Sequence, residues 1–153
     1  MPVVRVTPVY TPAVRGLCVK AYPNHPKGCP NFGKKAGCPP QAPQLPAFYD
    51  YSREFYAIYN VFDFGSHVAK MKAAHPEWSQ RQLDCCLYWQ PTARKQLEAE
   101  IRAFSAEHPG MDVNRCPEAM GLNVHETMRL TGLVLEWPPV TKAVQVALAG
   151  WPQ

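Results

Sequence analysis

The most regular pattern of apolar and polar residues lies between residues 91 and 108, in "PTARKQLEAEIRAFSAEH". Its apolar positions recur at spacings of four, four and three residues, at Ala93, Leu97, Ile101 and Phe104. This spacing places them on one face of a helix and leaves the polar residues on the other. Pro91 fits the first helical turn, where a residue without an N–H group is tolerated. The pattern therefore predicts an amphipathic helix that packs on a core.

Other apolar segments have the composition of strands. Residues 54–63, "EFYAIYNVFD", are almost continuously apolar and aromatic, which is typical of a central strand buried on both faces. We also expect strands over residues 15–22, which include Cys18, and over two closing segments, residues 133–137 and 141–150.

Capping residues predict three shorter helices. Ser66 is expected to cap a helix that ends before the next proline, and Ser79 a second helix that reaches the cysteine pair at 85 and 86. Asn123 and Glu126 have the spacing of a capping box and predict a third helix, which Gly132 would end.

This order of elements, with strands early, helices in the middle and strands at the end, predicts an α/β fold, with α+β as the alternative. We expect a single domain over residues 1–153. It would hold a central mixed sheet with flanking helices and a long loop rich in proline and cysteine at about residues 18–46. The sequence does not predict the order of the strands.

Composition narrows the class of protein. The chain has 153 residues, of which 46% are apolar, so a core can form without disulfides. The net charge of +4 suits an anionic small molecule or nucleic acid and does not decide between them. The first residues lack the apolar stretch of a secretory signal, and no apolar run is long enough to cross a bilayer. We therefore expect a cytoplasmic protein without membrane contact.

Six cysteines change this picture: Cys18, Cys29, Cys38, Cys85, Cys86 and Cys116. In a reducing compartment, clustered cysteines bind metal or do redox chemistry more often than they form disulfides. The paired knuckles of a structural zinc site and the C-x-x-C motif of thiol exchange are both missing. Cys29, Cys38 and Cys116 each precede a proline, as ligands in iron–sulfur proteins commonly do. The pattern favours an iron–sulfur cluster, with zinc or unrelated buried thiols as alternatives.

Three stretches resemble an uncharacterised family of small cysteine-rich, predicted metal-binding proteins: "CPNFGKKAGCPP", "CPEAMGLNVHETMRLTG" and, more weakly, "CLYWQPTARKQL". The resemblance implies a metal site, in which an iron–sulfur cluster of the 4Fe-4S type is favoured over zinc. Cys29, Cys38 and Cys116 match its cysteines best, Cys18 is the expected fourth ligand, and Cys86 is held in reserve. The family has no settled activity to lend to this chain.

The number of ligands decides between two kinds of function. With three cysteines, one iron keeps an open position and can act as a Lewis acid, which would suit redox or sulfur chemistry on a small or nucleobase-like substrate. With four, the cluster is closed and suits an electron carrier or a partner subunit. A structural zinc module is the third hypothesis. Phosphate-binding glycine loops and serine nucleophile elbows are absent from the sequence, so nucleotide hydrolysis and acyl transfer have no support.

Residues that could assist a substrate lie near these cysteines in the sequence. The catalytic candidates are Lys35, His125 and Glu126, and the candidates for substrate binding are Lys34, Lys35, Tyr88, Trp89 and Arg94. Aromatic rings beside basic groups can stack a base and hold a phosphate, although such rings more often pack in a core. The expected partner is a small molecule or a redox protein, and nucleic acid is the weaker expectation.

Overall fold

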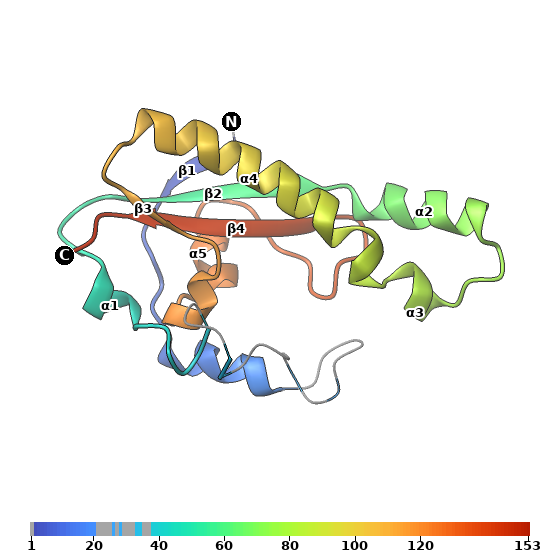
Figure 1. Cartoon of the computed structure of the whole chain (residues 1–153), viewed down its shortest axis with the longest axis horizontal. Coiled ribbons are helices and arrows are strands. Elements are labelled where there is room, and N and C mark those ends of the chain that lie inside the picture. Colours follow the sequence, from blue (N-terminus) through green and yellow to red (C-terminus); the bar gives the residue numbers. More distant parts are fainter. Residues whose placement is uncertain (1, 21–25, 27, 29–32, 35–37) are drawn as a thin grey trace.

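The computed structural model describes residues 2–20, 26, 28, 33, 34 and 38–153, with the backbone alone for Cys18 and Val19. Within these residues four strands form one sheet in the spatial order β1–β2–β4–β3 (Figure 1). The strands are β1 (Val3–Val6), β2 (Phe55–Phe62), β3 (Asp112–Asn114) and β4 (Ala143–Gly150). Together with its packed helices this sheet makes a single α+β domain.

Every pairing in this sheet is antiparallel. The long strands β2 and β4 form its centre, from Tyr56 opposite Ala149 to Phe62 opposite Ala143, and the short strands β1 and β3 lie at its edges. A parallel pair needs a crossover that returns the chain to the end where the previous strand began. Here neighbouring strands enter the sheet from opposite ends, so the predicted mixed sheet is wrong and the α+β alternative is confirmed.

Helices cover the sheet on both faces and extend beyond one end of it (Figure 1). In the described residues they are η1 (Pro12–Val19), α1 (Leu45–Phe48), α2 (Phe64–Ala74), α3 (Gln80–Leu83), η2 (Cys86–Tyr88), α4 (Gln90–Glu107), η3 (Pro117–Met120) and α5 (Val124–Arg129), the η segments being 3-10 helices. In this part of the chain no helix combines the length and the apolar character that crossing a membrane requires.

Helix α4 packs on one face of the sheet, as its periodicity predicts. Its buried residues are the expected four, Ala93, Leu97, Ile101 and Phe104. The last three form a cluster with Ile58 of β2 and Ala147 of β4. Pro91 lies in the first turn, where its missing N–H costs no helical hydrogen bond. The predicted helix is confirmed.

The opposite face of the sheet packs against α1, η3 and α5. Leu45 of α1, Met120 of η3 and Met128 of α5 are almost fully buried and belong to one cluster with Phe55 of β2. Since β2 sends Phe55 to this face and Ile58 to the α4 face, both of its faces meet apolar side chains. The prediction of a central strand over residues 54–63 is therefore confirmed.

Two predicted strands are wrong, and one more is confirmed. Residues 15–19 belong instead to η1, because Pro12 fixes a helical φ where that segment opens, and residues 21 and 22 lie outside the described residues. Residues 133–137 form no strand. The carboxylate of Glu136 accepts bonds from the N–H groups of Val140 (3.0 Å) and Thr141 (2.8 Å) and folds the segment into a turn. Residues 141–150 do contain the predicted strand, β4.

The helix starts agree with the sequence at two of three places. Ser79 caps α3 with a complete capping box, and Asn123 caps α5 by accepting the N–H three residues on at 3.0 Å. Helix α2 begins earlier than expected, because the Asp63 carboxylate accepts the N–H of Ser66 and takes the role of cap. Helix α3 ends at Leu83, before the cysteine pair.

Candidate metal centre

The four predicted metal ligands are described to different extents. Cys38 and Cys116 are described in full, Cys18 through its backbone in η1, and Cys29 lies outside the described residues. Among the described side chains, no three that commonly ligate metals gather in one place. The ligand set therefore stays a prediction, and the structure supplies the framework that carries three of its members.

The first part of this framework is the packing of η1 against η3, which brings the segment of Cys18 beside the one that Cys116 opens (Figure 1). The N–H of Thr11 donates to the carbonyl oxygen of Gly121 at 2.7 Å. Gly121 has a φ of +95°, and a Cβ at this position would lie 2.6 Å from the Tyr10 ring. Only glycine permits this approach without strain.

The second part is Arg15, which joins η1 to the turn after Cys38. One guanidinium nitrogen, Nη2, donates to the carbonyl oxygens of Ala42 at 2.8 Å and Pro40 at 3.2 Å. The turn itself is closed by the Ala42 N–H, which donates to the carbonyl oxygen of Cys38 at 2.9 Å. Because η1 contacts both η3 and this turn, the segments of Cys18, Cys38 and Cys116 meet in one corner of the molecule.

The surroundings of Cys38 are ordered by further hydrogen bonds. Its thiol is free and half-buried, and Pro39 is buried beside it. The N–H of Gly33 donates to the carbonyl oxygen of Pro39 at 2.8 Å, and Gln41 Nε2 donates to the carbonyl oxygen of Gly33 at 2.7 Å. These bonds place Lys34 on the exposed side of the Cys38 turn. Lys34 is thus a substrate-binding candidate that is described and lies four residues before Cys38.

Cys116 is exposed at the start of η3, and its backbone is held on both sides. Its N–H donates to Asn114 Oδ1 at 2.8 Å, and Pro117 after it is buried. Arg115 before it pairs with Glu98 of α4, with Nη2 2.9 Å from Oε2. This fixes the direction in which the Cys116 side chain leaves the backbone.

Acidic groups near this corner differ in their surroundings. Glu118, which the sequence did not single out, follows Cys116 by two residues, and its side chain is exposed. Glu126, a catalytic candidate, pairs with Arg129 at 2.8 Å, and this hydrogen bond holds its pKa below the ordinary value. Glu126 is therefore a weak base engaged with a cation. His125 is exposed, and Lys35 lies outside the described residues.

The residues around Cys86 belong to a different part of the molecule. Cys86 packs against the cluster of Phe64 and Trp89, and Trp89 is only 8% exposed. Trp89 thus offers a ligand little surface. Its neighbour Tyr88 is 52% exposed, and Arg94 is exposed with Nη2 bonded to a glutamine of the preceding turn at 3.1 Å. This placement gives no support to Cys86 as a ligand.

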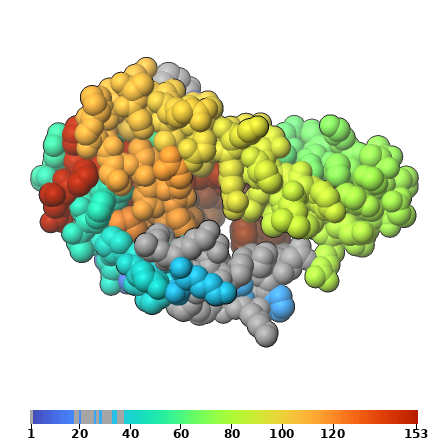
Figure 2. All heavy atoms as spheres, in the orientation of Figure 1, coloured from blue at the N-terminus to red at the C-terminus, as the bar shows by residue number. Residues whose placement is uncertain are grey.

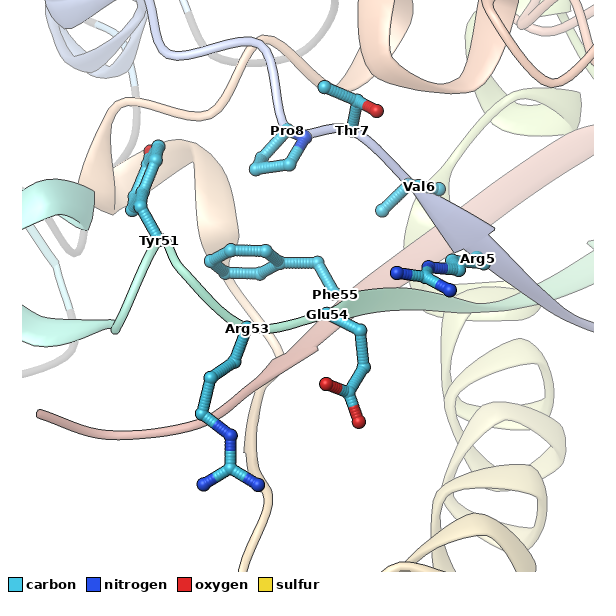
Figure 3. A pocket seen from close by; sticks show the side chains of 8 residues that line it. All are labelled: Arg5, Val6, Thr7, Pro8, Tyr51, Arg53, Glu54 and Phe55. Atoms are coloured by element: carbon cyan, nitrogen blue, oxygen red, sulfur yellow. The ribbon is translucent and has the colours of Figure 1, made fainter.

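A shallow pocket of about 230 Å³ lies between β1 and the start of β2 (Figure 3). Its lining residues are Arg5, Val6, Thr7, Pro8, Tyr51, Arg53, Glu54 and Phe55. Arg53 lies over the Trp151 ring, 3.7 Å from its centre, and Figure 3 shows its side chain on the same side as Glu54. The charged side chains of the lining are two arginines and one glutamate, and none of the predicted site residues that the structure describes is among them.

Comparison of the chain with models of protein families, with curated proteins and with solved structures gives no match.

Proposed function

We propose that this chain binds an iron–sulfur cluster of the 4Fe-4S type in the corner formed by η1, the turn after Cys38 and η3. Its ligands would be Cys18, Cys29, Cys38 and Cys116. Such a cluster supplies electron transfer or, where one iron lacks a protein ligand, a Lewis acid. The resemblance to predicted metal-binding proteins belongs to this proposal and rests on the cysteine–proline segments themselves.

One observation carries the proposal. Segments far apart in the sequence, each with a predicted cysteine ligand, are joined by backbone and guanidinium hydrogen bonds around η1. The free, half-buried thiol of Cys38 suits a thiolate ligand, and prolines after Cys38 and Cys116 limit the competing N–H donors. This donor chemistry fits iron–sulfur binding.

Zinc is the second candidate. Four thiolates also suit a closed tetrahedral zinc site, which would make the corner a structural clasp. The long gaps between the cysteines argue against it, since structural zinc sites usually bring ligands in closely spaced pairs.

The chain's own residues bear on whether the protein is an enzyme. Lys34 lies on the exposed side of the Cys38 turn and would attract an anionic substrate. His125 is exposed on α5, where a substrate could reach its imidazole. An enzyme would need these groups and an open iron, whereas an electron carrier or partner subunit would need only the closed cluster.

The first measurement is the iron and acid-labile sulfide content of anaerobically purified protein, together with its visible spectrum. Iron and sulfide in near-equal amounts with broad visible absorption would support the cluster. Zinc without sulfide would leave the structural clasp, and protein without either metal would overturn both candidates.

Single replacements by serine then test the ligands. Cys38→Ser and Cys116→Ser should each remove most of the iron and sulfide. Cys85→Ser is the matched control, because Cys85 is also a free, half-buried thiol but lies in the other cysteine group. A cluster that survives in Cys18→Ser and whose spectrum responds to added cyanide would favour the open-iron enzyme. Equal loss for all four cysteines would favour the carrier.

A further inference from the structure

Helices α2 and α3 with η2 form an outcrop at one end of the molecule, and the chain anchors it firmly to the sheet. In Figure 2 their green atoms lie apart from the orange atoms of η3 and α5. Trp89 stacks on Phe62 of β2 with ring centres 5.5 Å apart and meets Phe64 of α2 edge-on at 5.4 Å. Ala143 of β4 completes this cluster. The outcrop is therefore a fixed surface and not a loose extension.

Three aromatic rings lie in a row on the surface of the outcrop, and we call this row the stack. The rings of His75 and Trp78 are nearly parallel, 6° apart in plane and 4.1 Å between centres. The Tyr88 ring adjoins Trp78 at 4.9 Å between centres and is tilted by 39° to it. The Tyr88 residue is 52% exposed, and the His75 side chain is 42% exposed. The stack thus ends in two rings that still meet water.

A lysine holds the middle of this stack in place. Lys72 Nζ donates to the carbonyl oxygen of Pro76 at 3.2 Å and reaches that of Trp78 at 3.5 Å. These contacts fix the loop between α2 and α3, so the rings are ordered without a ligand. Leu87 beside Tyr88 is 77% exposed and extends the apolar surface.

Basic side chains surround these rings. The outcrop itself holds Lys70, Lys72 and Arg81, against the acidic Glu77 and Asp84. Arg94 and Lys95 follow in the first turns of α4. All five basic residues are exposed. The rings therefore lie among exposed cations of the outcrop and of the start of α4.

We propose that the His75–Trp78–Tyr88 stack and its basic surroundings bind single-stranded nucleic acid. Unpaired bases stack on exposed aromatic rings, and lysine and arginine attract the phosphates between them. A duplex keeps its bases stacked inside and could use only the charges. The stack lies on other elements than the predicted metal ligands, so this proposal does not rest on a cluster being present.

Fluorescence anisotropy tests the stacking. It measures how the purified full chain binds labelled oligo(dT) or oligo(U) of about 16 nucleotides. Tyr88→Ala should weaken binding about ten-fold or more, whereas Tyr88→Phe should keep it, because the ring face is what stacks. Tyr51→Ala is the matched control. Tyr51 is 46% exposed and lines the pocket beside β2. The preference between the two oligomers distinguishes DNA from RNA.

Salt dependence tests the charges. Arg94→Ala should reduce the slope of the logarithm of affinity against the logarithm of salt by about 0.7. Arg102→Ala on the same helix is the control and should leave the slope unchanged, since Arg102 lies two turns further along α4 and away from η2. Both arginines are exposed.

Three results would overturn the proposal. The first is no binding of either oligomer at low salt, which would leave the apolar rings to a protein partner. The second is equal affinity for a duplex of the same length. The third is binding that Tyr88→Ala and Tyr51→Ala weaken alike.

Discussion

The hydroxyl of Tyr49 donates a hydrogen bond of 2.5 Å to Oδ2 of Asp112. This bond ties the residue after α1 to the first residue of edge strand β3, across 63 positions of the chain. Tyr49 has no exposed surface, and its ring meets Phe48 and Phe55 edge-on. Burial first, and then Asp112, raise the pKa of the phenol far above its usual value. The polar end of the tyrosine is thus satisfied inside the core.

Tyr49→Phe should lower the free energy of unfolding by about 2 kcal/mol at neutral pH, because the bond lost has a charged acceptor. A pH dependence accompanies this loss. With a pKa raised in the folded protein, the Tyr49 contribution is complete below about pH 10 and is lost as pH rises above it. Urea unfolding across this range should therefore show a smaller alkaline loss for Tyr49→Phe than for the unchanged protein. Equal alkaline loss in both would contradict the finding.

Gly150 in β4 lies against two aromatic rings. A Cβ at this position would be 2.8 Å from the Phe55 ring and 2.9 Å from the Tyr49 ring. Gly150→Ala should therefore destabilise the fold by about 1–3 kcal/mol through overpacking. Gly16→Ala is the control, since nothing lies within 4 Å of a Cβ there. Thermal unfolding of the two variants side by side measures the difference. A similar melting temperature for both would show that the rings shift without cost.

Glu136 gives the fold an acid-sensitive turn. Hydrogen bonds from the Thr141 side chain, and from the N–H groups of Thr141 and Val140, lower the pKa of its carboxyl to about 2. Its contribution is therefore present above about pH 4.5 and is lost as pH falls towards 2. Glu136→Gln should be less stable than the unchanged protein at neutral pH. The gap between their urea midpoints should narrow with acid, and a gap that widens instead would exclude this role.

In protein that holds the proposed cluster, Arg15 should affect metal retention more than it affects the fold. Its Nη2 donates to two carbonyl oxygens of the turn after Cys38, and lysine has a side chain one bond shorter without the planar guanidinium. Arg15→Lys should release iron faster to a chelator while thermal unfolding of metal-free protein changes little. Arg102→Lys, an exposed arginine of α4, should behave like the unchanged protein. Unaltered iron release in Arg15→Lys would mean that the η1 link does not support the metal.

Long, strongly patterned elements could be predicted from the sequence. The spacing from Ala93 to Phe104 fits a helix that packs on a core. The apolar run of β2 fits a strand buried between two layers. Edge strands β1 and β3 are four and three residues long, too short for alternation to stand out. Their place depends on β2 and β4, which local sequence does not reveal.

The errors have local physical causes. The strand expected at 133–137 does not form, because the carboxylate of Glu136 accepts hydrogen bonds from the N–H and the hydroxyl group of Thr141. These bonds hold the segment in a turn. The sequence also does not reveal which of two adjacent aromatic residues is buried. Trp89 lies in the core and Tyr88 faces water, and the packing of α2 and β2 determines this difference. Cysteine–proline pairs indicate which thiols could bind a metal, but no sequence pattern predicts the hydrogen bonds through which Arg15 joins η1 to the turn after Cys38.

The position of β4 has a consequence for how this chain is made. Strand β4 comes after the other three along the chain, yet it lies between β2 and β3 in the sheet. Until residues 143–150 leave the ribosome, the edge of β2 that pairs with β4 in the folded sheet has no partner strand. Open edges of this kind pair with other copies. Slow translation after α5 should therefore favour aggregation, and a chaperone that shields β2 during synthesis should raise the yield of folded protein.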